Sequence, residues 1–183
     1  MTDPSRHVQS PVDLLENGFI AGTWNLDPQQ SRIEFAVKHF WGAVTVRGSF
    51  TVLRGEAAVG ADRTVTGELS ADATSLNTKN KKRDEHLRSN DFFDAERHPQ
   101  FVIAVAAAQP AEPDAVSFRG TLAAAGHVQP IEFTGQVIEA SAQAITLRTD
   151  LTVDRTAFGM TWSPLGMTSK TAIGTAVTRW VRA

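Results

Sequence analysis

Hydrophobic and polar residues alternate along most of this chain. Between residues 32 and 39, Ile33, Phe35, Val37 and His39 share one side of an extended backbone, whereas the positions between them are mostly charged. A period of two predicts a β-strand with one face in a core and the other in water. The same pattern predicts further strands at residues 44–53, 65–73, 101–107, 116–124, 131–137, 145–153 and 173–181, and a short one at residues 24–27.

Short breaks separate these strands. Glycine, proline and aspartate interrupt the alternation at residues 60–62, 110–114 and 126–130, and such clusters are typical of turns. Eight or nine strands with short connections fit either a β-sandwich or a closed antiparallel β-barrel. An eight-stranded barrel is just wide enough to hold one small ligand. The periodicity alone does not choose between the two.

Four glycines in the middle of predicted strands favour the barrel. Gly48, Gly67, Gly120 and Gly135 occupy positions on the apolar face. Glycine weakens a strand, and it marks a bulge, a barrel corner or a close approach to the backbone. The glycines therefore indicate either bends that close a barrel or a ligand that lies against the barrel wall.

One segment, residues 75–99, departs from the strand pattern. Residues 79–88 contain no glycine, proline or β-branched residue, so we predict a short helix there, with Asn77 or Thr78 as its N-cap. The helix is rich in Lys and Arg, and two phenylalanines follow it. Such a helix could cap a barrel mouth and meet an anionic head group. A solvated connecting helix with locally paired charges is the simpler interpretation of the pattern.

Composition narrows the function classes. The chain has 183 residues, 18 Lys and Arg against 20 Asp and Glu, a net charge of −2 and no cysteine. This length favours one domain, and the near-neutral charge predicts neither a nucleic-acid partner nor a polybasic membrane patch. Disulfides, thiolate metal ligands and cysteine nucleophiles are excluded.

The N-terminal residues differ from the rest. We expect residues 1–21 to be a partly flexible extension and residues 22–183 to be the β-barrel domain. Residues 1–18 contain acids and prolines and lack the apolar run of a signal peptide. This predicts a cytoplasmic protein, or a periplasmic or secreted one if the natural chain begins upstream. No stretch of about 18 residues is wholly apolar, so no membrane-spanning helix is expected. Whether the chain forms a homodimer stays open.

Catalytic and metal-binding motifs are weak. The chain has no GxSxG, P-loop or GxGxxG motif. His39 would point inward if its strand continues that far, where it could meet a polar head group. His39, His86 and His98 could converge as metal ligands, but their spacing matches no compact metal motif. The sequence therefore predicts neither a metal site nor a cofactor.

Several short motifs follow one another in a fixed order. They are residues 24–28 (WNLDP), Ser31 with 35–39 (FAVKH), 48–50 (GSF), 83–94 (RDEHLRSNDFFD), 98–101 (HPQF), and Arg155 with 158–160 (FGM). The ordered set resembles the YceI-like family of lipocalin-shaped proteins over residues 22–183. Residues 162–169 (WSPLGMTS) are harder to match to the family pattern.

The resemblance implies an all-β fold: an extended eight-stranded antiparallel, lipocalin-like β-barrel with a short basic helix between strands. It also implies an elongated apolar channel that holds a polyisoprenoid or another long-chain lipid, for transport or storage. Within the basic helix, it marks His86 as a residue that orients the ligand.

We expect apolar side chains from successive strands to line this channel and polar ones to surround its mouth. The predicted lining residues are Phe35, Val37, Val46, Phe50, Phe101, Ile103, Phe118, Leu122, Phe133, Leu147 and Met160. The predicted mouth residues are His39, Arg83, His86, Arg88 and Arg155. For each apolar residue, ordinary core packing is the simpler alternative.

Two other function classes stay open at this point. One is an enzyme, an isomerase or hydrolase that acts on a hydrophobic substrate through His39 or His86. The other is a structural domain without a ligand. An enzyme should bring polar groups together at one depth of a cavity, whereas a carrier should show an apolar tube with polarity only at its mouth.

Overall fold

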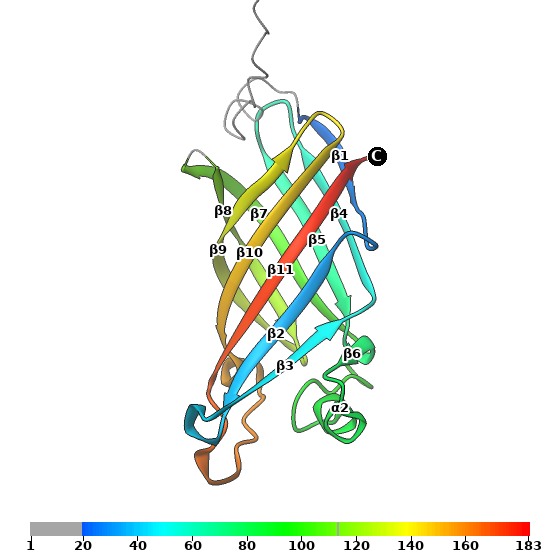
Figure 1. Cartoon of the computed structure of the whole chain (residues 1–183). Helices are drawn as coiled ribbons and strands as arrows, with labels where there is room; N and C mark the ends of the chain where they lie inside the picture. Colours follow the sequence, from blue (N-terminus) through cyan, green and yellow to red (C-terminus); the bar gives the residue numbers. More distant parts are fainter. Residues whose placement is uncertain (1–19, 113) are drawn as a thin grey trace, which may run out of the picture.

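The chain folds into a closed, elongated β-barrel (Figure 1). The computed structural model describes residues 20–112 and 114–183, so residues 1–19 of the predicted N-terminal extension lie outside the described residues. The strands are β1 Gly22–Leu26, β2 Arg32–His39, β3 Val44–Phe50, β4 Leu53–Val59, β5 Val65–Asp72, β6 Leu76–Asn77, β7 Gln100–Glu112, β8 Ala115–Ala124, β9 His127–Ala140, β10 Ala144–Asp154 and β11 Thr171–Arg182. Four 3₁₀ turns join them: η1 Phe40–Gly42, η2 Ala73–Ser75, η3 Arg155–Phe158 and η4 Pro164–Gly166.

Antiparallel pairing closes the barrel at β1. This strand pairs with β4 on one side and with β11 on the other. Further along the barrel, β2 takes the place of β1 beside β11, and β3 takes the place of β4. The pairs β1/β2, β3/β4 and β5/β6 therefore each act as one bent strand, and the wall has eight strand positions. The predicted eight-stranded antiparallel barrel is confirmed.

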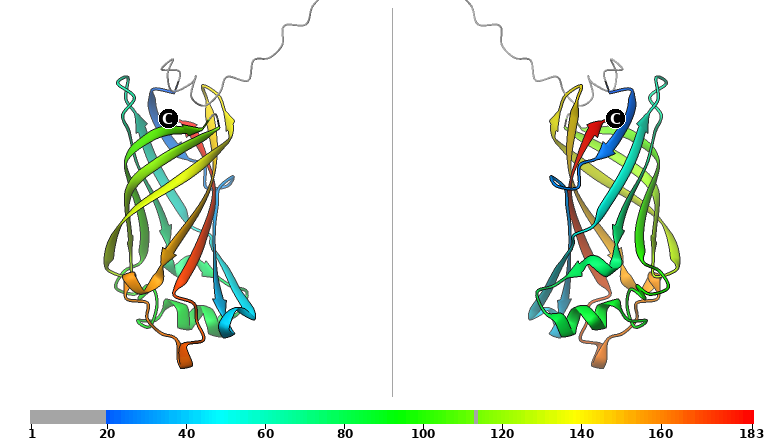
Figure 2. Two further views of the ribbon diagram at one scale, coloured as in Figure 1. Left: turned by 90° about the vertical axis from the view of Figure 1, so that its left-hand side faces the viewer. Right: turned by 90° about the vertical axis from the view of Figure 1, so that its right-hand side faces the viewer.

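The helix α2, Lys81–Arg88, lies across one end of the barrel (Figure 2). The prediction of the helix was right, but its start was wrong. Lys79 has a left-handed backbone with φ of 60°, so a helix cannot run through it. Asn80 caps the helix instead, and its side chain accepts a hydrogen bond from the Arg83 N–H. No helix in the described part of the chain is long and apolar enough to cross a bilayer.

Three predicted strand boundaries also need correction. The strand expected at residues 44–53 stops at Phe50, because the next two backbone N–H groups turn to the Ser75 hydroxyl. The chain then continues as β4, which was not predicted because glycine and alanine weaken its alternation. The breaks expected at 110–114 and 126–130 are shorter, since β7 extends to Glu112 and β9 already begins at His127. A proline at position 110 is tolerated because β7 pairs with β5 only as far as Val105.

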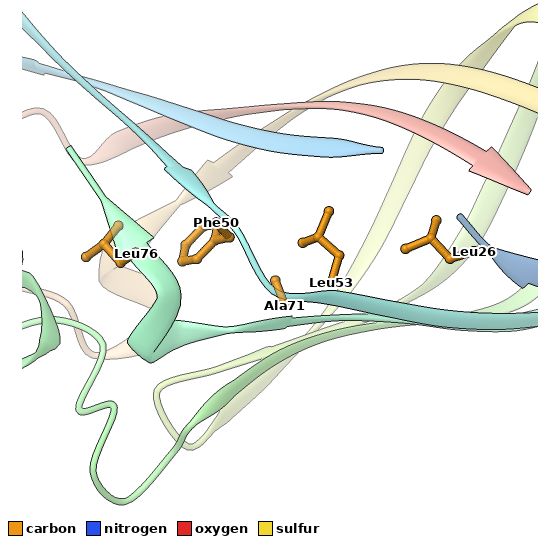
Figure 3. Close-up of a cluster of buried hydrophobic side chains, with 5 residues drawn as sticks. All are labelled: Leu26, Phe50, Leu53, Ala71 and Leu76. Atoms are coloured by element: carbon orange, nitrogen blue, oxygen red, sulfur yellow. The ribbon is translucent and has the colours of Figure 1, made fainter. Parts of the chain in front are cut away.

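Buried side chains form an inner cluster along the barrel (Figure 3). It consists of Leu26, Phe50, Leu53, Ala71 and Leu76. A second cluster around Leu122, Ile131, Phe158 and Met160 packs at the end that carries α2.

The mid-strand glycines make room for the protein's own groups. A Cβ atom on Gly48 would lie 2.5 Å from the Phe35 ring, and one on Gly135 would lie 2.9 Å from the Phe118 ring. Gly120 sits opposite a bulge in β7 that follows Val105, where a Cβ atom would collide with the Ala104 carbonyl. A Cβ atom on Gly67 would lie 3.0 Å from the Ala57 methyl group. All four glycines therefore leave space that other atoms of the barrel occupy.

We predict that Gly120→Ala destabilises the fold by roughly 1–3 kcal/mol, because backbone cannot move aside as a flexible side chain can. Gly174→Ala in β11 is the matched control, since its new Cβ would meet only the Leu151 carbonyl oxygen, at an ordinary 3.7 Å. Urea unfolding of the two variants measures the difference. Equal midpoints would contradict the assigned contact.

Candidate functional site

The barrel interior contains two hollows. The large cavity, about 600 Å³, lies at the α2 end and is lined by residues that include Phe35, Phe101 and Trp162. The small cavity, about 170 Å³, lies toward the opposite end and is lined by residues that include Trp24 and Phe133. They share no lining residue. The inner cluster packs against side chains of both walls, so it stands between them.

Ten of the eleven predicted apolar residues lie on these walls. Phe35, Val37, Val46, Phe101, Leu122 and Met160 line the large cavity. Ile103, Phe118, Phe133 and Leu147 line the small one. Phe50 differs, because it is buried in the inner cluster, with its ring centroid 4.9 Å from that of Phe101.

The burial of the wall residues shows that the interior is not filled. Phe35, Phe101, Phe118 and Phe133 face inward but are only partly buried. A packed core would bury such side chains almost completely, as it does Leu76 at 1% exposure. The apolar faces therefore enclose open space.

Three rings meet at the mouth of the large cavity. The His86 ring lies edge-on to Trp162, with centroids 4.7 Å apart, and to Phe92 at 5.2 Å. On its outer side, His86 Nε2 lies 3.0 Å from a carboxylate oxygen of Asp91. This part of the mouth thus combines an apolar aromatic surface with the solvent-exposed His86–Asp91 pair.

The other predicted histidines have different partners. His39 also lines the large cavity, and its Nδ1 lies 2.8 Å from the Thr168 hydroxyl. His98 borders a separate polar cavity of about 310 Å³, where its Nε2 lies 3.9 Å from Asp94. Within residues 20–112 and 114–183, no group of three or more His, Cys, Asp or Glu side chains could hold a metal ion.

Thr78 fastens α2 to the barrel. Its backbone N–H donates to the buried Asp84 carboxylate at 2.9 Å, and its hydroxyl donates to the same oxygen at 2.5 Å. Arg83 donates to the Thr78 hydroxyl and carbonyl. The Thr78 methyl group in turn occupies space left free by Gly48 on β3. The basic helix therefore has a fixed position beside the cavity.

The predicted arginines split into two kinds. Arg83 lines the large cavity while it holds Thr78. Arg88 is not on that wall; it donates to the Leu76 carbonyl, and its buried Nε has no hydrogen-bond partner. Arg155 lines the large cavity but is 4% exposed and points its donors at protein carbonyls.

Arg155 organises the loop that follows β10. Its guanidinium donates to the carbonyls of Ser169 at 2.7 Å, Thr168 at 3.4 Å and Met160. Burial lowers the pKa of Arg155, and the neighbouring Asp154 carboxylate opposes that effect. The pKa of the Asp154 carboxyl group is lowered mainly by a hydrogen bond from the Thr156 hydroxyl. A second hydrogen bond, from the Thr156 backbone N–H, lowers it further. One buried cation thus ties both ends of the 155–170 loop together.

Several wall residues were missed by sequence reasoning. Trp24, Val105, Val137 and Ile145 line the small cavity, and the alternation already placed them within or beside predicted strands. Trp162 lies in a segment without alternation, so no periodic signal pointed to it.

Comparison with known proteins identifies the family to which this chain belongs. The family model described as the YceI-like domain matches residues 24–179. The chain belongs to the YceI-like domain family. This membership accounts for the ordered motifs, which fall on β1, β2, β3, the α2 segment, the start of β7 and η3.

Relatives and solved structures agree with the assignment. A UPF0312 protein of Staphylococcus aureus is 40% identical over 74 residues, which span 38% of this chain and 42% of that protein. The crystal structure of Burkholderia cenocepacia BcnA superposes with a TM-score of 0.76 at 17% identity, covering 84% of this chain and 98% of that one. A structure from Saccharophagus degradans, described as a polyisoprenoid binding domain, gives a TM-score of 0.72 at 18% identity and covers 87% of this chain and 98% of that one. These structural likenesses establish the YceI-like barrel fold.

We predict that Arg155→Met loosens the loop and lowers the free energy of unfolding by roughly 1.5–3 kcal/mol, the range for hydrogen bonds to a charged group. The methionine fills similar space but leaves three carbonyls without their donor. Hydrogen exchange should quicken in residues 159–170 and stay unchanged in β8. Unchanged exchange across the loop would show that Arg155 does not organise it.

Proposed function

We propose that this YceI-like domain binds a long-chain isoprenoid or a similar amphiphilic lipid inside the barrel and carries or stores it. The observation that carries the proposal is the pair of apolar cavities along one closed barrel. The Saccharophagus degradans relative, whose description names polyisoprenoid binding, supports the same ligand class.

The distribution of polarity supports binding over catalysis. The wall of the small cavity is almost wholly apolar, whereas His39, Arg83, His86 and Arg155 all line the large cavity at the α2 end. Each of these groups already has a protein partner. Polarity thus collects toward the mouth of an apolar interior, as expected of a carrier.

Burial of the ligand chain dominates the energetics. An isoprene unit of five carbons contributes about 3–4 kcal/mol gross when it leaves water, at about 0.8 kcal/mol per carbon. An exposed ion pair with a head group contributes about 0–1 kcal/mol. Immobilising the chain offsets part of the first contribution. In this proposal the cavities set affinity, and the mouth sets orientation.

The enzyme hypothesis has less support. His39 and His86 line the same cavity, but His39 is paired with Thr168 and His86 with Asp91. Because the His86–Asp91 pair is open to solvent, with side chains 39% and 48% exposed, it lacks the water-excluded setting that strengthens electrostatic catalysis. We therefore propose no catalytic residue.

Native mass spectrometry of the purified full chain tests the proposal. We expect a fraction of the protein to carry an added mass that organic extraction releases as a prenyl or other long-chain lipid. Protein without added mass that also fails to bind a supplied polyprenyl probe would refute lipid binding.

A paired substitution locates the ligand. Ala172 on β11 lines the large cavity, whereas its neighbour Ile173 is 43% exposed to solvent. We expect Ala172→Trp to fill the cavity and weaken binding of a polyprenyl probe by about tenfold or more, since overpacked interiors resist further insertion. Ile173→Trp should leave the affinity unchanged. Circular dichroism confirms that both variants fold, and equal affinities would place the ligand elsewhere.

A further inference from the structure

The outer surface at the α2 end exposes large apolar side chains on two loops. On η1, Phe40 and Trp41 are 48% and 76% exposed, and on η4 Leu165 is 86% exposed. Trp162, on the rim of the large cavity, is 37% exposed. Isolated apolar residues on a surface are ordinary, but neighbouring large ones mark an interaction site. We call Phe40, Trp41 and Leu165 the apolar tip.

The two loops of the apolar tip are held side by side. The Trp41 N–H donates to the Met167 carbonyl at 3.4 Å, and the Ser169 N–H donates to the Lys38 carbonyl at 2.9 Å. Both loops lie at the same end of the barrel as α2, and the loop around η4 extends outward from it (Figures 1 and 2). The tip is therefore a fixed feature of the mouth.

Positive charge surrounds the apolar tip. Residues 38–47, 76–99 and 154–171 together contain ten Lys and Arg against six Asp and Glu, a balance of +4. Since the whole chain carries −2, the remaining residues carry −6. Lys79 just before α2 is exposed, as are Lys81 and Lys82 in its first turn, and Lys38 and Lys170 are exposed next to the two loops. The near-neutral overall charge hides this asymmetry.

We propose that the α2 end of the barrel docks onto an anionic lipid bilayer, with the apolar tip in the head-group region and the lysines over the surface. Tryptophan favours the membrane–water interface. Apolar burial and attraction to anionic lipid together hold proteins at that interface. Docking would place the mouth of the large cavity against the bilayer, so a lipid could pass between the two without crossing bulk water.

Charge complementarity favours a bilayer over a second copy of this chain. A symmetric dimer through the tip would bring together two barrel ends that each carry an excess of basic residues, because a two-fold interface pairs each patch with itself. An anionic membrane instead offers opposite charge to the lysines and an apolar layer to the tip. Phe40 and Lys82 also line the large cavity, but docking needs no lipid inside the barrel, so this proposal stands apart from the proposed function.

Vesicle co-sedimentation tests the proposal with the full chain. The probes are vesicles of phosphatidylcholine alone and of an equal mixture of phosphatidylcholine and phosphatidylglycerol. We expect binding to the mixed vesicles that weakens as salt rises, and at least about tenfold weaker binding to the neutral ones, because screening and neutral lipid both remove the electrostatic attraction.

Substitutions separate the apolar contribution to vesicle binding from the electrostatic one. Trp41→Ser with Leu165→Ser should weaken binding to mixed vesicles by about tenfold or more, since both apolar contacts are lost. Ile138→Ser is the control, because Ile138 is 59% exposed but lies near the opposite end of β9. Lys81→Glu with Lys82→Glu should weaken binding to mixed vesicles and reduce its salt dependence.

Three outcomes would overturn docking. The first is wild-type protein that does not sediment with mixed vesicles, and the second is equal loss of binding in the Ile138 control. The third is a wild-type dimer in sedimentation velocity that Trp41→Ser with Leu165→Ser dissociates, in a protein that does not bind vesicles. That result would make the tip a self-association surface. Native mass spectrometry of the same variants reports lipid occupancy separately, so failure of docking is distinguishable from failure of lipid binding.

Discussion

The structure depends on a closed ring of main-chain hydrogen bonds. Because β1 pairs with both β4 and β11, the described strands complete a circle. A closed ladder satisfies the backbone within the wall, so the wall does not need a fully packed centre in order to be continuous. This is the condition that lets apolar side chains face open space, in contrast to a sandwich, whose two sheets are held by the packing between them.

The closed ring of strands also explains why the α2 end of the barrel differs from the other end. The bends at β1/β2, β3/β4 and β5/β6 change strand partners partway along the barrel, and α2 follows directly after the last of these bends. The helix is then fastened through Thr78, Asp84 and Arg83, and the loop after β10 is fastened through Arg155. Most polar groups near the cavity are thus engaged in building the mouth.

Sequence alone predicted the features that repeat and missed those set by single contacts. The period-two pattern located most strands and nine of the eleven predicted channel residues, because a strand in a barrel alternates between interior and solvent. It failed at β4, where small residues carry little hydrophobic signal, and at the α2 start, where Lys79 has a left-handed backbone and its N–H donates to the Asn77 side chain. It also placed Phe50 on the wall, because periodicity shows which face a residue occupies but not whether a neighbouring ring covers it.

The inner cluster has a consequence for the shape of any guest. Since the two cavities have no lining residue in common, a molecule that fills both must thread past Phe50 and Leu53. A flexible chain can pass when these side chains change rotamer. A rigid fused-ring molecule of the same hydrophobicity could pass only if the strands separated. If the barrel holds a ligand as proposed, we therefore expect it to select guests by cross-section and flexibility, through the side chains of the inner cluster.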